Sequence, residues 1–331
     1  MTKPNQSKPN LIKPNLIKPA PGSSPDILAL GEPMIEFNQV KGQDSQRFGR
    51  NFLQGFGGDT SNFVIAAARQ GASTGYLSAL GADANGALLR RLWEEEGVDH
   101  SRVLENRSAP TGMYFVTHGP KGHEFTFARA GSAASLYAPA DVPVDAIGAA
   151  KVLHLSGISL AISNMACDAC YAAIAAARTG KTLVSFDTNL RLKLWSKERA
   201  RAIMNDVIAL SDILLPSYDD IVALSDLTAP DAIVDHLLGK GAKIVALKLG
   251  SEGALVADSH RRFRIPPHPC TPIDATGAGD CFGGAFVARI VAGDDIEAAG
   301  CYAGVAAALS TEGYGAVAPI PTADVVKRAM R

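Results

Sequence analysis

From residue 151 onward, the sequence alternates short, continuous apolar runs with segments of helical character. The runs are "KVLHLSG", "TLVSFDTN", "DILLPS", "KIVALKLG" and "GALVADS". Strands that are apolar at nearly every position are typical of a parallel sheet that is buried on both faces. Helices between such strands provide the crossover connections that parallel strands need. We therefore predict an α/β fold with a doubly wound, mostly parallel sheet and helices on both of its faces.

The N-terminal half adds a second kind of β-structure to this sheet. Residues 34–55 and 112–129 have the alternation and the turn residues of exposed strands and hairpins. We expect these segments to form a small β lid beside the α/β body, with both parts in one domain, residues 26–331. A lid of few strands has exposed edges, and pairing two lids would cover them, which favours a homodimer through the lid.

The first 25 residues have a different composition from the rest of the chain. They repeat Lys-Pro-Asn and Leu-Ile-Lys-Pro units and contain no apolar core of the length found in a secretory signal. Such a segment cannot bury enough surface to fold alone. We predict that residues 1–25 form a disordered, low-complexity tail.

Charge and cysteine content limit the partners and the location of the protein. The 32 basic and 33 acidic residues give a net charge of −1, so the chain lacks the basic excess typical of proteins that bind nucleic acid or membrane surfaces. No apolar run approaches the length of a membrane span. Five cysteines in 331 residues favour a reducing environment. We therefore expect a cytoplasmic protein without a nucleic-acid or membrane partner.

The stretch "DATGAGDCFGGAF" combines a glycine-rich turn with an acidic residue. Gly277, Ala278 and Gly279 precede an apolar helical segment, so their backbone N–H groups can converge on an anion at a helix N-terminus. Asp280 follows them directly. Taken alone, the stretch fits two interpretations: an anion site with a proton-handling acid, or a turn with an ordinary early-helix aspartate.

Three stretches together resemble the ribokinase-like, or PfkB, family of carbohydrate kinases. "DATGAGDCF" is similar to the family signature D-T-x-G-A-G-D, and "GGDTSNFVIAAARQGASTGYLSALGADANG" is similar to its G-G-x-x-x-N helix and following strand. "LKLGSEGALV" resembles the strand-turn-strand that lies by the nucleotide in these enzymes. The resemblance covers about residues 26 to 325. It implies a ribokinase-like fold and phosphorylation of a hydroxymethyl group with ATP and Mg²⁺.

The same resemblance assigns the catalytic residues. Asp280 would be the catalytic base, and the amides of Gly277, Ala278 and Gly279 would form the anion hole. A carboxylate at a helix N-terminus has a low pKa, so we expect Asp280 to be a weak base. It would orient the hydroxyl group and take up its proton late, because positioning and charge stabilisation dominate phosphoryl transfer.

Two sets of binding residues also follow from the resemblance. The sugar would be bound by Gly57, Gly58, Asp59, Asn62, Tyr114, Arg129 and Arg191. The nucleotide would be bound by Asn189, Ser217, Lys248, Gly250, Ser251, Gly253, Gly277 and Gly279.

The expected metal site departs from the family pattern. Many relatives carry N-x-x-E near the metal and phosphates, whereas this chain has "PSYDD", with Ser217 and Asp220. Asp220 would organise Mg²⁺, or Ser217 and Asp220 would form a helix capping box. Both interpretations stay open here, and so does the use of a monovalent cation.

Three local features resemble 2-keto-3-deoxygluconate kinases within the family. They are the aspartate in "GGDTSN", the stretch "FTFARAGSAASL" and the stretch "FDTNLRLKLW". Arg129 and Arg191 lie in the second and third of these, and two guanidinium groups suit the carboxylate of an acidic sugar. We therefore expect phosphorylation of the terminal hydroxyl of 2-keto-3-deoxygluconate, which gives the 6-phosphate.

Other features keep alternative functions open. Phe127 stands where relatives often have tyrosine, and "EGYGAVAPIP" lacks an acid that some of these enzymes use. Each arginine also fits a plain surface charge or a phosphate contact. A fructokinase or another neutral-sugar kinase is the alternative. A catalytically inactive sugar-binding regulator is disfavoured, because the run from Gly277 to Asp280 is intact.

Overall fold

The computed structural model describes residues 24–40, 51–119 and 122–331. Residues 1–23, which make up nearly all of the expected tail, lie outside the described residues. Within the described ranges, no helix has the length and apolar character needed to cross a membrane.

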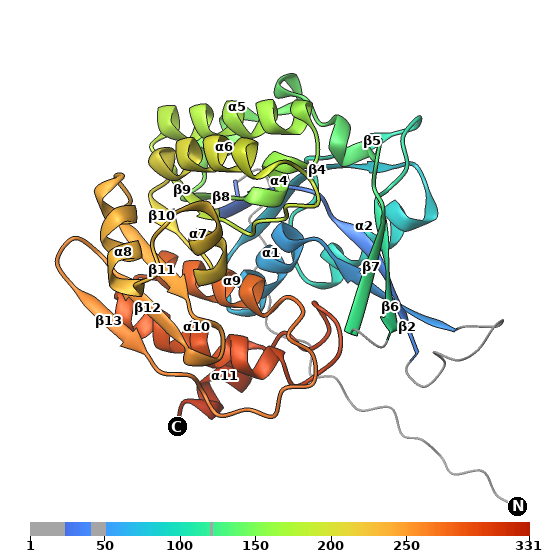
Figure 1. The fold of residues 1–331 in the computed structure, drawn as a ribbon. Helices are drawn as coiled ribbons and strands as arrows, with labels where there is room; N and C mark the ends of the chain where they lie inside the picture. The colour runs from blue at the N-terminus through green and yellow to red at the C-terminus, as the bar shows by residue number, and fades with distance from the viewer. Residues whose placement is uncertain (1–23, 41–50, 120–121) are drawn as a thin grey trace, which may run out of the picture.

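A large sheet forms the centre of the α/β body (Figure 1). Its strands in the described chain are β1 (Ile27–Leu30), β4 (Thr74–Gly81), β5 (Val103–Asn106), β8 (Val152–Ser156), β9 (Leu183–Asp187), β10 (Ile213–Leu214), β11 (Ile244–Lys248), β12 (Ala254–Ala257) and β13 (Arg262–Ile265). They lie in the order β13-β12-β11-β10-β9-β8-β1-β4-β5. Only the β11–β12 and β12–β13 pairs among them are antiparallel. The predicted, mostly parallel sheet is confirmed.

Helices cover both faces of this sheet (Figure 1). One face packs against α1 (Asp59–Arg69), α2 (Ala84–Glu95), α9 (Ala278–Val291), α10 (Ile296–Ser310) and α11 (Ala323–Ala329). The other packs against α3 (Val144–Ala149), α4 (Gly157–Ala161), α5 (Asn164–Gly180), α6 (Lys197–Leu210), α7 (Tyr218–Leu224) and α8 (Pro230–Gly239). Successive residues of β1 alternate between the two cores, with Ile27 and Ala29 in one and Leu28 and Leu30 in the other. This alternation explains why the central strand is apolar throughout.

A separate small sheet forms the expected lid. It consists of β2 (Met34–Gln39), β3 (Phe52–Gly57), β6 (Met113–Gly119) and β7 (Gly122–Ala128), in the order β3-β2-β6-β7. β2 and β6 run parallel, and the two outer pairs are antiparallel. Glu36 of β2 lies opposite Gly55 of β3 and Tyr114 of β6, and Tyr114 lies opposite Phe127 of β7. These four residues therefore share one face of the lid.

The crossing of α1 and α9 positions the functional residues. The two helices approach so closely that a Cβ atom at Gly284 would lie 2.3 Å from the carbonyl oxygen of Phe63. Only glycine permits this approach of the two backbones. The contact lies within the first two turns of each helix, and so it brings the N-terminal turns of α1 and α9 together.

Candidate active site

Asp280 lies in the first turn of α9, where Asn62 of α1 contacts it. Asn62 Nδ2 donates a hydrogen bond of 2.8 Å to Asp280 Oδ2, while the buried Asn62 Oδ1 has no hydrogen-bond partner among the described residues. The N-cap residue Gly277 has φ 77°, and a Cβ atom there would lie 2.9 Å from the side chain of Ala316. Glycine is therefore required at the turn that exposes the first amides of α9.

Burial and neighbouring carboxylates raise the pKa of Asp280 to about 8. Loss of hydration is the largest cause, and the charges of Asp59 and Asp187 add to it. The hydrogen bond from Asn62 and the charge of Lys248 lower the pKa, but together they do not offset these causes. The low pKa expected from the helix N-terminus is therefore wrong, because that expectation ignored the burial of Asp280 and, to a smaller extent, the charges from distant segments. Asp280 is a stronger base than an ordinary aspartate.

The two neighbouring carboxylates have different partners. Asn189 Nδ2 donates a hydrogen bond of 2.8 Å to Asp59 Oδ2, and Lys248 Nζ forms an ion pair of 2.5 Å with Asp187 Oδ2. Burial raises the pKa of Asp187, and the charge of Lys248 opposes this effect. A Cβ atom at Gly279 would lie 3.4 Å from Lys248 Nζ. The ammonium group thus lies beside both Asp187 and the anion-binding turn.

Asp220 contacts the loop that follows β9 instead of capping its own helix. Its Oδ2 accepts hydrogen bonds from Thr188 Oγ1 (2.9 Å) and from the backbone N–H of Leu190 (3.2 Å). Ser217 is the N-cap residue of α7, but its side chain makes no capping hydrogen bond. The capping-box interpretation is therefore wrong. Asp220 remains a proposed metal-organising acid.

No group of three or more His, Cys, Asp or Glu side chains in the described ranges is arranged to hold a metal ion alone. Mg²⁺ usually binds one or two carboxylates and completes its coordination with phosphate oxygens and water. Asp187, the last residue of β9, and Asp220, in the first turn of α7, are carboxylates that could serve in this way.

Ser217, Lys248 and the predicted glycine turn lie at the carboxyl ends of β10 and β11, whereas Asn189, also predicted to bind the nucleotide, follows β9 and is bonded to Asp59. The backbones of Ser217 and Lys248 form an isolated parallel β-bridge. The turn after β11 contains the short 3₁₀ helix Gly250–Glu252. Gly253 has φ 88°, and a Cβ atom there would lie 2.1 Å from the carbonyl oxygen of Ile265. The exposed Ser251 lies at this turn. Ligands bind at this end of the strands in open α/β sheets.

The lid contributes the predicted Tyr114, which is buried, and a carboxylate, Glu36, that the sequence interpretation missed. Tyr114 Oη donates a hydrogen bond of 2.5 Å to Glu36 Oε2, and burial raises the pKa of Glu36. A Cβ atom at Gly57 would lie 2.4 Å from Tyr114 Oη, and Gly58 has φ 99°. The signal for Glu36 was a charged residue within the otherwise apolar run "MIEF".

The two arginines expected to bind a sugar acid have different environments. Arg129 is half-buried and forms an ion pair with the buried Glu32, which also accepts a hydrogen bond of 2.5 Å from Ser132 Oγ. Burial raises the pKa of Glu32, although the charge of Arg129 opposes this effect. Arg191 is exposed on the loop after β9 and donates a hydrogen bond of 2.9 Å to the carbonyl of Leu190. It makes no ion pair with any described residue.

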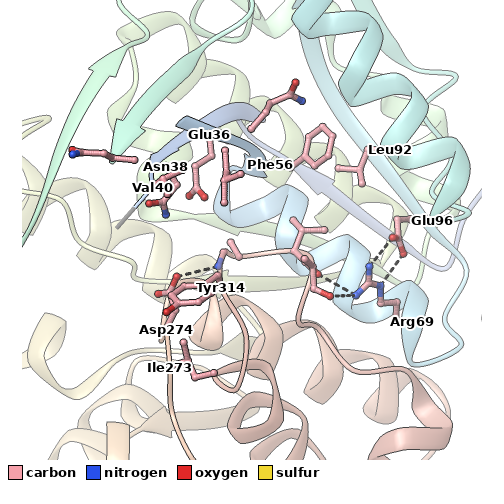
Figure 2. A pocket seen from close by; sticks show the side chains of 18 residues that line it. Glu36, Asn38, Val40, Phe56, Arg69, Leu92, Glu96, Ile273, Asp274 and Tyr314 are labelled. Carbon is pink, nitrogen blue, oxygen red and sulfur yellow. Dashed lines mark hydrogen bonds and ion pairs between the residues drawn. The ribbon is translucent and has the colours of Figure 1, made fainter. Parts of the chain in front are cut away.

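A cavity of about 590 Å³ lies between the lid and the segment 314–318 (Figure 2). Glu36 and Asp274 line it on the side of the active site, and Arg69 and Glu96 line its far end. Its described lining does not include Asp280. The cavity therefore adjoins the candidate active site without containing the proposed base.

Sequence and structure comparisons identify the family. A sequence model described as "pfkB family carbohydrate kinase" matches residues 24–323. The chain belongs to the PfkB family of carbohydrate kinases. The PfkB relatives include a 2-dehydro-3-deoxygluconokinase of Thermoproteus tenax, 33% identical over 81% of this chain and 83% of the relative. They also include fructokinase-1 of Oryza sativa subsp. japonica, 31% identical over 93% of this chain and 98% of the relative.

Solved structures of this family have the same fold. A putative ribokinase II from E. coli, in complex with ATP and Mg²⁺, superposes with a TM-score of 0.85 and is 26% identical. The superposition covers 92% of this chain and 99% of the E. coli protein. The fold is therefore ribokinase-like, as predicted.

Proposed function

We propose that this PfkB kinase transfers the γ-phosphoryl group of ATP to the terminal hydroxyl of 2-keto-3-deoxygluconate, giving the 6-phosphate. The family provides the carbohydrate kinase activity, and the sugar is the part proposed here. The relative from T. tenax and the three sequence features described above support this substrate. The chemistry of one side chain, Arg191, carries the argument further.

Arg191 offers a guanidinium group without an internal counter-charge. It follows Asn189, which is bonded to Asp59 at the N-terminus of α1, by two residues. An arginine on this loop suits a bidentate hydrogen-bonded ion pair with a carboxylate. A neutral sugar needs no such charge.

Arg129 has a different proposed part in substrate binding. Because Glu32 already neutralises it, Arg129 provides directed N–H donors and little net charge. Its guanidinium also lies 5.7 Å from the ring centre of Phe127 on the lid. We expect Arg129 to fix the lid and to donate to sugar oxygens, while Arg191 recognises the carboxylate.

The proposed mechanism uses residues from both helices that meet at the site. Asn62 orients Asp280, which accepts the proton from the attacking hydroxyl group. The first amides of α9, at Gly277–Gly279, stabilise the charge on the transferred phosphoryl group. Lys248, held by Asp187, adds a positive charge beside these amides.

The nucleotide would lie along the turn after β11 and the N-cap of α7, where Gly250, Ser251, Gly253 and Ser217 are found. Mg²⁺, when bound, would neutralise phosphate charge, with Asp220 and Asp187 as the protein carboxylates nearby. We keep a role for a monovalent cation as a prediction.

A neutral-sugar kinase is the second candidate, and Glu36 favours it. A buried carboxylate on the lid accepts hydrogen bonds from sugar hydroxyls but repels an acidic sugar. The fructokinase relative from O. sativa is consistent with this candidate. The two candidates therefore differ in which charged residue dominates recognition, Arg191 or Glu36.

Activity with a panel of sugars and sugar acids tests the proposal. Replacing Arg191 by Ala should lower kcat/KM for 2-keto-3-deoxygluconate by ~10- to 150-fold, because a charge-assisted contact is worth about 1.5–3 kcal/mol. Activity with fructose should change much less. Lys193→Ala is a matched control, since it removes another exposed positive charge from the same loop. A wild-type preference for fructose, or equal losses on both sugars, would contradict the sugar-acid assignment.

A further inference from the structure

We propose that Arg69 and Gln70, at the far end of α1, are positioning residues for the catalytic turn at Gly277. The inference rests on the proposed function in treating Gly277–Asp280 as the phosphoryl-transfer site. The residues act through the segment 314–321, which connects the end of α1 to that turn.

Arg69 donates hydrogen bonds to backbone carbonyl groups of this segment, and it also forms a bidentate ion pair with Glu96 (Figure 2). Its Nη1 donates to the carbonyl oxygens of Val317 (3.0 Å) and Ile320 (2.5 Å). Its Nε and Nη2 donate to the two carboxylate oxygens of Glu96, at 2.8 and 2.7 Å. The Arg69 and Glu96 side chains are only 13% and 14% exposed, so solvent screens this pair weakly. The ion pair with Glu96 therefore orients the Arg69 guanidinium independently of its hydrogen bonds to the carbonyl groups.

Gln70 fastens the next residue of the segment. Its Nε2 donates a hydrogen bond of 2.8 Å to the carbonyl of Pro321, and its Oε1 accepts one of 2.8 Å from Tyr302 Oη. Gln70 and Tyr302 are both buried. Both ends of the Gln70 amide are thus used, which sets the orientation of the side chain.

Gly315 and Ala316, at the other end of the segment, contact the proposed catalytic turn at Gly277. The N–H of Gly315 donates a hydrogen bond of 3.0 Å to Asp274 Oδ2, and Asp274 Oδ1 accepts from the N–H of Thr276 at 3.0 Å (Figure 2 shows the first bond). Ala316 fills the space beside Gly277, so a shift of Ala316 would let the turn relax. Helix α1 therefore supports the proposed catalytic group at both ends, through Asn62 at its start and Arg69 at its end.

Kinetics of Arg69→Met provide the first test. Methionine keeps the apolar volume and removes all five N–H donors. A displacement of the turn by a fraction of an ångström should lower kcat at least tenfold, since 1 Å of misplacement costs about 100-fold. KM for the sugar should change less than about threefold, because the proposed sugar contacts lie at the other end of α1. Gln70→Leu should show the same pattern to a smaller degree.

Two controls separate positioning from a loss of stability. Ile174→Val trims the core on the opposite face of the sheet, and it should lower Tm without lowering kcat below the melting range. Arg69→Lys keeps one charged donor and should recover part of kcat. Equal losses of kcat in Arg69→Met and Ile174→Val at matched distance from Tm would overturn the proposal, and so would a rise in KM that accounts for the whole loss.

Hydrogen–deuterium exchange of the full chain decides the question without activity. Arg69→Met should speed exchange of the amides in 274–280 as well as in 314–321, whereas Ile174→Val should not. Unchanged exchange in 274–280 would overturn the proposal. If the wild-type protein phosphorylated no sugar, the proposed function would fail, but this measurement would still decide whether Arg69 orders the turn.

Discussion

Asp280 is buried beside two further carboxylates, and its loss of hydration, more than their charges, determines how easily it releases a proton. Asp59 and Asp187 both disfavour its charged form, while Lys248 is the one cation among the main causes of its shifted pKa. A base with a pKa near 8 holds a proton more firmly than an ordinary aspartate, which suits late uptake of the hydroxyl proton. Burial, with a smaller contribution from the neighbouring charges, therefore gives this carboxylate the basicity that the helix N-terminus alone would remove.

Replacing Asp280 by Asn should remove this base with little change in shape. We expect kcat to fall by about 100-fold or more, the scale of a positioned acid–base group. Affinities for ATP and sugar, measured by calorimetry, should stay close to those of the wild type. Turnover near the wild-type rate would show that Asp280 is not the base.

The raised pKa of Asp280 also predicts how activity and stability depend on pH. Activity needs the deprotonated form, so kcat/KM should fall about tenfold per pH unit below about 8. Stability changes with pH in the opposite direction, because folded Asp280 holds its proton more tightly than the unfolded chain does. The resulting contribution to the free energy of unfolding is fully present below the unfolded pKa. It is lost as the pH rises through about 8. Asp280→Asn should therefore raise Tm relative to wild type more at about pH 9 than at about pH 5. A Tm difference that does not depend on pH would contradict the raised pKa.

The sequence predicted the identity of the proposed base but not its environment. Asp280 stood out in the sequence because it directly follows a glycine-rich turn and lies at the start of an apolar helical segment. The positions of Glu36 and Glu32 at the site come from tertiary packing. The pKa of Asp280 likewise depends on residues far away in sequence, such as Asp59 and Asp187. No local pattern records those distances.

At the level of elements, the crossing of α1 and α9 connects packing to chemistry. Gly284→Ala would place a Cβ atom 2.3 Å from the Phe63 carbonyl, so the helices must separate. We expect a destabilisation of about 1–3 kcal/mol, measured by urea denaturation, together with a lower kcat as Asn62 moves away from Asp280. Gly239→Ala is the control, because a Cβ atom there meets nothing within 4 Å. Equal stability of the two variants would show that the helices repack easily.

Strands β8 to β12 of the main sheet were predictable because their burial leaves a local record of continuous apolar residues, whereas the edge strands β5 and β13 carry exposed residues and were not predicted. The lid was predictable only as two β segments, since the parallel pairing of β2 with β6 joins residues about 80 positions apart. Likewise, the antiparallel edge formed by β12 and β13 follows from the tight turn after β11 and the pairing that it permits. Element type follows from local pattern, whereas neighbour and direction follow from tertiary packing.

For the whole molecule, the lid predicts association. Leu53, Phe125 and Phe127 are 65%, 40% and 43% exposed, and their register places them on one face of the lid. We expect a homodimer in which these three exposed side chains are covered, because exposed apolar clusters on short sheets favour association. Phe125→Asp should shift the mass measured by light scattering from dimer to monomer. Val144→Asp, at an exposed apolar position on α3, should not; a monomeric wild-type protein would refute the prediction.

The unpaired charge of Arg191 has a consequence for how such kinases diverge. Arg191 is exposed and supports neither core of the sheet nor the turn at Gly277, so mutations there can accumulate without loss of folding or of phosphoryl transfer. Sugar-acid and neutral-sugar relatives match this chain at 33% and 31% identity, so overall similarity hardly separates the two substrate classes. Under the proposed role of Arg191, a change of one or two codons in this loop would alter which sugar the enzyme uses. The same proposal implies that gene assignments for these kinases need the loop residues in addition to overall identity.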